Sequence, residues 1–157
     1  MYILGIDPGF GRLGYGIIEY RNSKYRLVEY GCITTPANER LPSRLKKIQD
    51  DLEEIISRYN IDEASVEDLF FNTNIRTGIQ VAEARGVILC TLEKHGIKIN
   101  EYTPLQVKQA ITGYGKADKQ QMQKMVQVLL NLDSIPKPDD AADALAIALC
   151  CGNSERF

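Results

Sequence analysis

Four acidic residues occupy positions at which they could act together on a phosphate ester. Asp7 and Glu67 each follow a short apolar run of strand-forming residues, whereas Asp140 and Asp143 begin an apolar segment near the end of the chain. Ligands bind at the carboxyl ends of strands in open α/β sheets, and helical residues three apart project from one face. We therefore expect the four carboxylates to converge.

Carboxylates that share a site require a positive partner. Each pair about 4 Å apart repels by roughly 4 kcal/mol at an effective dielectric near 20. Mg²⁺ prefers oxygen ligands, and two such ions would neutralise four carboxylates. A pair of ions roughly 3.5 to 4 Å apart can activate a water beside a phosphodiester and stabilise the leaving oxygen. The pattern favours two Mg²⁺ ions per site, with Mn²⁺ expected to substitute, and this chemistry requires no histidine.

Taken singly, each acid also has an ordinary structural explanation. Asp7-Pro8-Gly9 is typical of a turn, and Glu67 could be a solvated strand end. Asp140 and Asp143 suit the positive end of a helix dipole. For any one acid these structural roles are at least as common as a catalytic role, so only the combination favours a metal site.

The elements that must position these acids follow from the spacing of apolar residues. β-branched runs predict strands over 2–6, 15–20, 25–33, 64–67 and 97–102, the first three forming a meander. Helical spacing predicts helices over 41–59, 74–94, 104–111, 119–130 and from 139 onward, with Asp118 as a plausible cap. This order indicates an α/β fold with a mixed five-stranded sheet flanked by helices on both faces. The length of 157 residues fits a single domain, 1–157.

Composition excludes several classes of protein. The chain is 44% hydrophobic and 25% charged, as ordinary globular proteins are. No signal-peptide pattern precedes Asp7 and no apolar stretch is long enough to cross a bilayer, so a cytoplasmic location is expected. The cysteines show no paired spacing for zinc and are expected to be reduced structural thiols: Cys32, Cys90, Cys150 and Cys151.

The charge distribution permits a nucleic-acid partner although the formal net charge is −2. Residues 103–125 contain one acid, Asp118, and four lysines: Lys108, Lys116, Lys119 and Lys124. This stretch could form a basic face, although lysines commonly just solvate a helix. Phe70, beside Phe71, follows Glu67 and is suited to stacking on a base, which contributes roughly 1 to 3 kcal/mol. One of these two phenylalanines could instead belong to the core.

Five motifs, in the same order along the chain, resemble the RuvC family of Holliday junction resolvases. Gly5-Ile6-Asp7-Pro8-Gly9, continued by Gly14-Tyr15-Gly16, resembles the opening signature of the family. The later matches are Val66-Glu67 followed by Phe70, then Glu83 to Val87, Gln106 to Gln109, and Asp140 to Ala146. The resemblance covers essentially the whole chain.

This resemblance implies an RNase H-like fold and a homodimer that places paired, symmetric nicks across a four-way DNA junction. It further implies a branch-migration complex of the RuvA and RuvB type as a partner. The fourth acid is aspartate where some members carry histidine. By resemblance, the catalytic metal-binding acids are Asp7, Glu67, Asp140 and Asp143, and the DNA-contacting residues are Phe70, Lys108 and Lys119.

Two other functions stay open at the level of sequence. One is a junction-binding module without catalysis, which the presence of all four acids disfavours. The other is a fragment of an actin-like phosphotransferase, because Gly5 to Gly9 also resembles the first phosphate loop of actin-like kinases and ATPases. Such enzymes need a second, similar domain to close over the nucleotide. This chain has the length of a single domain.

Overall fold

A mixed five-stranded sheet forms the centre of the molecule, for which the computed structural model describes residues 1–68 and 75–154. The strand order is β3-β2-β1-β4-β5. The first three strands form the expected antiparallel meander, and β4 and β5 run parallel to β1. The strands are β1 (Tyr2–Asp7), β2 (Arg12–Arg21), β3 (Lys24–Thr34), β4 (Glu63–Glu67) and β5 (Lys98–Tyr102). The predicted mixed sheet is therefore confirmed.

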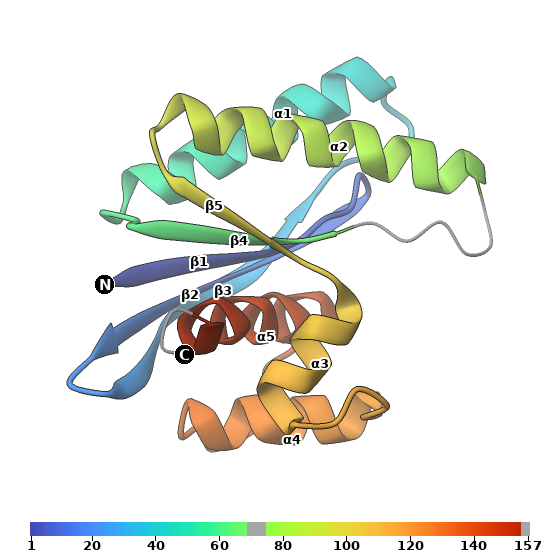
Figure 1. Cartoon of the computed structure of the whole chain (residues 1–157). Helices are drawn as coiled ribbons and strands as arrows, with labels where there is room; N and C mark the ends of the chain where they lie inside the picture. The colour runs from blue at the N-terminus through green and yellow to red at the C-terminus, as the bar shows by residue number, and fades with distance from the viewer. Residues whose placement is uncertain (69–74, 155–157) are drawn as a thin grey trace.

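Helices cover both faces of this sheet, also as expected (Figure 1). On one face lie α1 (Leu41–Ser57) and α2 (Ile75–Lys94). On the other face, α5 (Asp139–Ser154) contacts the sheet directly, with α3 (Pro104–Thr112) and α4 (Lys119–Leu129) packed beneath it. The predicted cap is confirmed as well, because the Asp118 side chain accepts a hydrogen bond from the backbone of Gln121.

The second strand begins earlier than its sequence predicts. We expected it over residues 15–20, and Gly14, just before this range, is a poor strand former. In the structure the strand starts at Arg12, since Gly14 pairs with Asp7 of β1 and with Cys32 of β3. Pairing on both sides thus overrides local propensity at Gly14, and pairing with Thr34 of β3 extends the strand to Arg12.

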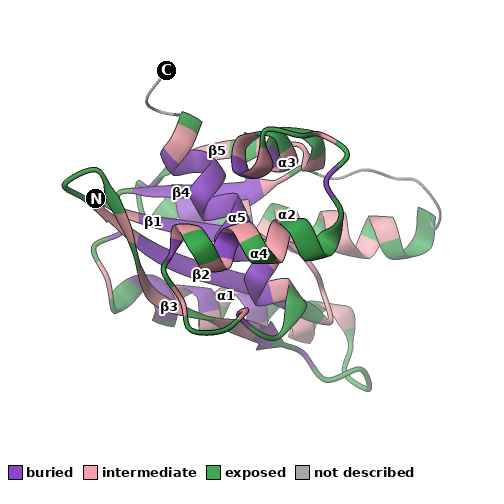
Figure 2. Cartoon of the chain, turned by 90° about the horizontal axis from the view of Figure 1, so that it is seen from below, coloured by how far each residue is buried: buried purple, intermediate pink, exposed green. Residues whose placement is uncertain are grey.

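Two apolar layers hold the helices to the sheet. Under α1 and α2 the layer includes Ile6, Ile48 and Ile88, all with no exposed surface. Under α5 it includes Ile18 and Leu145, also fully buried. Figure 2 shows α5 almost entirely in the buried class. Asp143 is the one residue between Ala141 and Gly152 that is not buried, which marks it as an exception in an apolar helix.

Within the described part of the chain, the helices are all too short or too polar to span a bilayer.

Candidate active site

The four acids singled out in the sequence meet at one edge of the sheet. Asp7 is the last residue of β1 and Glu67 is the last residue of β4, and these strands are parallel neighbours. Single carboxylate oxygens of Asp7, Asp140 and Asp143 all lie within 4.8 Å of one another. The Glu67 side chain shares a hydrogen bond with that of Asp7. The expected convergence of carboxylates is present.

Burial raises the affinity of three of these carboxyl groups for protons, those of Asp7, Glu67 and Asp143. The pKa of Asp7 rises from 3.8 to about 8, mainly because the group is buried and then because Glu67, Asp143 and Asp140 add negative charge. Burial, followed by the charge of Asp143, also raises the pKa of Glu67. Burial likewise raises the pKa of Asp143, although the positive charge of Lys119 opposes this effect. Without a cation, the cluster carries more negative charge than its surroundings compensate.

This donor set suits divalent magnesium or manganese. The ligand atoms are carboxylate oxygens, which hard cations prefer, and three of them lie close enough to share one ion. A bound cation would favour the ionised carboxylates and so lower the raised pKa values. The residues present therefore fit the metal chemistry expected from the sequence.

In metal-free buffer, the stability of the folded chain is expected to fall as the pH rises from about 4 to about 8. Between these values folded Asp7 retains a proton that the unfolded chain has lost, because its folded pKa is about 8 against 3.8. Raising the pH therefore favours the unfolded chain. We expect Tm in EDTA to fall by roughly 5 °C between pH 5 and pH 8.

Asp7→Asn provides the comparison for this measurement. The variant should show a shallower dependence on pH and a higher Tm than the wild type at pH 8 in EDTA. Mg²⁺ should raise the Tm of the wild type by binding the folded state alone. Equal pH slopes for the two proteins would contradict the assignment of the proton to this cluster.

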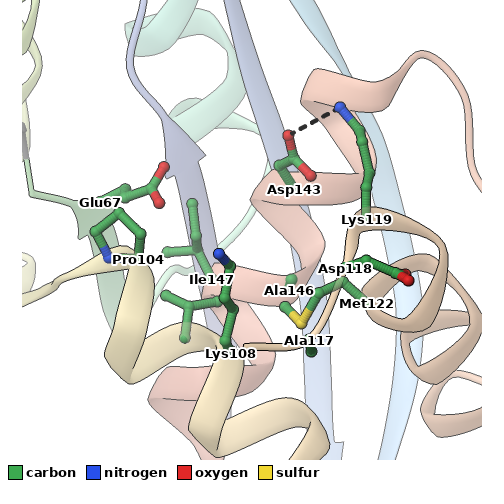
Figure 3. Close-up of a pocket in the computed structure, with 11 residues that line it drawn as sticks. Glu67, Pro104, Lys108, Ala117, Asp118, Lys119, Met122, Asp143, Ala146 and Ile147 are labelled. Carbon is green, nitrogen blue, oxygen red and sulfur yellow. Dashed lines mark ion pairs between the residues drawn. The ribbon is translucent and has the colours of Figure 1, made fainter. Parts of the chain in front are cut away.

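A cleft of about 310 Å³ opens beside the acids, between β4, α3, α4 and α5. Glu67 and Asp143 line one end of it, and Figure 3 shows both side chains projecting into the same space. Lys108 of α3 and Lys119 at the start of α4 also line this cleft. Both lysines predicted to contact DNA therefore lie next to the candidate metal ligands.

Lys119 has acidic partners that the sequence did not reveal. Its ammonium lies 2.9 Å from a carboxylate oxygen of Asp139 and 4.0 Å from one of Asp143. The hydrogen bond with Asp139 raises the pKa of Lys119 and lowers that of Asp139. Asp139 was overlooked because it reads as a helix-start acid, although its adjacency to Asp140 was visible.

Arg12 is a second residue of the site that sequence reasoning overlooked. It begins β2 and places its guanidinium 3.7 Å from a carboxylate oxygen of Asp140. The sequence signal was weak, because Arg12 falls in the stretch expected to be a turn between two strands. Arg12 and Lys119 therefore flank the acids from two different elements.

Arg85 of α2 supports the strand that carries Glu67. Its side chain is only 13% exposed and pairs with Glu101 and, at 3.7 Å, with Asp68. Its Nε donates a hydrogen bond of 3.1 Å to the backbone carbonyl of Glu67. These contacts fix the end of β4 from the helix that lies across it.

The remaining sequence predictions have different outcomes. Phe70 and Phe71 lie outside the described residues, so base stacking by Phe70 stays a prediction. Lys116 is exposed on the loop between α3 and α4, and Lys124 is exposed in the middle of α4. All four cysteines are free, which agrees with the expectation of reduced thiols.

Comparisons with known proteins agree on one family. Residues 3–151 match the family model described as crossover junction endodeoxyribonuclease RuvC. The chain is 56% identical over 157 residues to the protein of that name from Halothermothrix orenii, covering 100% of this chain and 95% of the relative. It is 53% identical to the protein of that name from Alkaliphilus oremlandii, covering 100% of this chain and 96% of that relative.

A solved structure extends this similarity to three dimensions. The Thermus thermophilus RuvC in complex with Holliday junction substrate superposes on this chain with a TM-score of 0.91 at 31% identity. The match covers 99% of this chain and 96% of the other. It confirms the RNase H-like fold expected from the sequence.

Proposed function

Since the chain belongs to the RuvC family of crossover junction endodeoxyribonucleases, we propose that it resolves four-way DNA junctions by hydrolysing phosphodiester bonds. The substrate class follows from the family and from the similar structure solved with a Holliday junction. Asp7, Glu67, Asp140 and Asp143 are the proposed catalytic acids. The paired, symmetric placement of the nicks is part of the proposal.

The observation that carries this proposal is the convergence of four carboxylates beside a cleft lined by lysines. Three of the acids bring oxygens within 4.8 Å of one another, and the fourth bonds to Asp7. Lys108 and Lys119 line the adjoining cleft, where each can bind phosphate as a point charge. Such contacts give affinity and salt dependence without reading the base sequence.

The proposed chemistry is hydrolysis with water as the nucleophile. Two bound Mg²⁺ ions would activate the water and stabilise the leaving oxygen, with Mn²⁺ as a substitute. The four acids hold the cations, and the lysines hold the strand against them. Phe70 is proposed to stack against an unpaired base at the crossover.

A homodimer completes the proposed function, because one site cuts one strand and a four-way junction has near two-fold symmetry. Exposed apolar side chains on α2 support a contact between the two copies at this helix. Ile75 and Ile79 lie one turn apart on that helix and are 75% and 50% exposed. A branch-migration complex of the RuvA and RuvB type is the proposed further partner.

A nicking assay on synthetic DNA tests this function. We expect incision of a four-way junction in Mg²⁺, no incision in EDTA, and a rate at least about 100-fold lower on a linear duplex of the same sequence. The expected symmetry predicts that products from opposing strands appear together and can be ligated. Equal cleavage of duplex and junction would contradict structure selectivity.

The same assay discriminates the two alternatives. A junction-binding module would shift the junction in a gel without cutting it in either Mg²⁺ or Mn²⁺. An actin-like phosphotransferase would hydrolyse ATP and would not require DNA. The four convergent acids and the family match over residues 3–151 support the nuclease over both.

A further inference from the structure

We infer that Arg12 couples metal binding to DNA binding, by pairing with Asp140 when the acids hold no cation and turning to a DNA phosphate when they do. This inference rests on the proposed nuclease function and adds a residue to it. The ion pair of Arg12 with Asp140 measures 3.7 Å, and 56% of the Arg12 side chain is exposed. The guanidinium thus lies at the rim of the acid cluster rather than within it.

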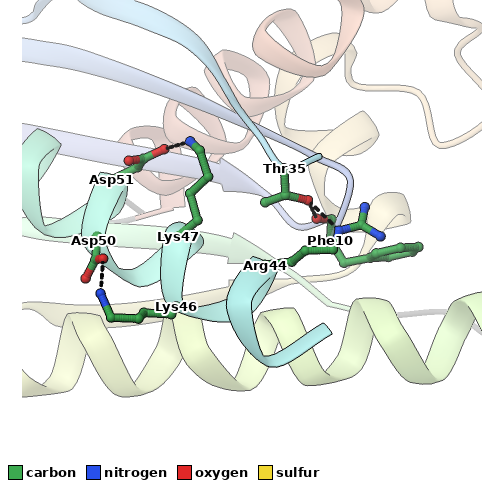
Figure 4. Close-up of polar contacts among 7 residues, drawn as sticks. All are labelled: Phe10, Thr35, Arg44, Lys46, Lys47, Asp50 and Asp51. Carbon is green, nitrogen blue, oxygen red and sulfur yellow. Dashed lines mark hydrogen bonds and ion pairs between the residues drawn. The ribbon is translucent and has the colours of Figure 1, made fainter. Parts of the chain in front are cut away.

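A set of polar contacts holds the turn that precedes Arg12, and Figure 4 shows the three residues that make them, Phe10, Thr35 and Arg44. The Thr35 hydroxyl donates to the carbonyl of Phe10, and the Thr35 amide donates to the carbonyl of Gly11 at 3.0 Å. Arg44 of α1 donates to the Thr35 hydroxyl at 2.9 Å and lies 4.7 Å from the centre of the Phe10 ring. The turn between Asp7 and Arg12 is therefore held to the residue that follows β3 and to α1.

These contacts limit the positions that the Arg12 guanidinium can reach. Because the backbone at Arg12 is paired with Thr34 of β3 as well, the side chain moves about a fixed point within reach of Asp140. Within residues 1–68 and 75–154, Asp140 is its one ion-pair partner. Loss of that partner leaves an arginine whose fork geometry matches a phosphate group at the edge of the cluster.

Charge explains why the two roles alternate. A cation that binds Asp140 satisfies the carboxylate to which Arg12 was paired and repels the guanidinium. In the absence of a cation, Arg12 competes for the same oxygens and weakens metal binding. Lys119 differs from Arg12 because Asp139 holds it at 2.9 Å whether or not Asp143 binds a cation. Arg12 therefore differs from Lys119 in being free to change partners.

Thermodynamic linkage makes the effects of Arg12 reciprocal. If the bound cation releases Arg12 toward phosphate, the cation tightens DNA binding by the same factor by which DNA tightens cation binding. An arginine that acted only as a surface charge would weaken metal binding and favour DNA binding equally in all conditions. The proposal instead predicts that Arg12 contributes to DNA binding only when a cation occupies the acid cluster.

Arg12→Gln in the full chain tests the proposal, with Arg26→Gln as the matched control. Arg26 pairs with Glu19 at 2.8 Å near the far end of the sheet and is 72% exposed. Calorimetric titration of Mn²⁺ without DNA should show about three- to tenfold tighter binding in Arg12→Gln. Junction affinity in EDTA should change less than about twofold, whereas in Ca²⁺ it should weaken about three- to tenfold. Arg26→Gln should change none of these values.

Each outcome bears on the proposal separately from the nuclease assignment. Unchanged or weaker Mn²⁺ binding by Arg12→Gln would overturn the competition with metal. Equal loss of junction affinity in EDTA and in Ca²⁺ would overturn the change of partner from Asp140 to phosphate. Arg12 would then contact DNA whether or not a cation is bound. Arg12→Lys should restore the metal affinity of the wild type but only part of the Ca²⁺-dependent DNA affinity. Because the Mn²⁺ titration uses no DNA, it reports on Arg12 even if the wild type fails to cut junctions.

Discussion

Asp7→Asn is expected to abolish incision of a four-way junction, with a rate loss on the order of 100- to 1,000-fold, while the variant still binds the junction. Asp7 is the member of the cluster that interacts with all the others. It hydrogen-bonds Glu67, and the charges of Asp140 and Asp143 both act on it. An amide in its place removes one negative charge and one cation ligand from the centre of the site.

Binding should persist because the groups proposed to hold phosphate are not altered. Lys108 and Lys119 line the cleft from α3 and α4, and neither depends on Asp7 for its position. Removal of a negative charge near the phosphate also lowers electrostatic repulsion. We therefore expect a junction Kd equal to or lower than that of the wild type in EDTA.

Asp133→Asn is the matched control for this experiment. Asp133 is an exposed aspartate between α4 and α5, outside the cleft and the acid cluster. This variant should cut at the rate of the wild type. Incision by Asp7→Asn at a normal rate, under the conditions in which the control is active, would remove Asp7 from the mechanism.

The acid cluster could be predicted from the sequence because each acid occupies a position with a simple geometric meaning. Strand ends in a parallel pair meet at one edge, which placed Asp7 beside Glu67. Helical spacing placed Asp140 and Asp143 on one face of α5. Local rules sufficed in these cases, since every residue needed only its own strand or helix to be identified.

The partners of the basic residues could not be predicted in the same way. Arg85 looked like an ordinary helix charge, yet it is only 13% exposed because its partners come from β5 and from the end of β4. Arg12 looked like a turn residue, because β2 reaches it only through pairing with Thr34 of β3, a distant segment of the chain. Ion pairs between distant segments follow from the packing of the whole sheet, which no local pattern specifies.

Gly14 was recognised as part of a motif, but its physical role emerges only from the packing of α5. A Cβ atom at this position would lie 2.0 Å from the backbone oxygen of Asp140 and 3.0 Å from the backbone nitrogen of Ala141. Contacts this short with backbone cannot be relieved by a change of side-chain rotamer. The first turn of α5 can thus approach β2 only because residue 14 has no side chain.

Gly14→Ala is therefore expected to damage both stability and catalysis. Overpacking against backbone should lower the free energy of unfolding by about 3 kcal/mol, which corresponds to a fall in Tm of roughly 6 to 12 °C for a chain of this size. The strain can be relieved by displacement of the first turn of α5, which carries Asp140 away from Asp7. A misplacement near 1 Å costs about 100-fold in rate, so junction cleavage should fall by about that factor at a temperature where the variant is folded.

Gly86→Ala separates this effect from the general consequences of replacing glycine. Gly86 lies on an exposed turn of α2, and a Cβ there would meet no atom within 4 Å. Alanine favours the helix over glycine by up to about 1 kcal/mol, so this control should unfold at an equal or higher temperature. Circular dichroism gives the Tm of each variant, and the junction assay gives its rate below that temperature. If Gly14→Ala cut junctions at the normal rate, the position of Asp140 would not depend on the close approach of α5 to β2, and the acids would tolerate a looser geometry than hydrolysis at a shared cation site requires.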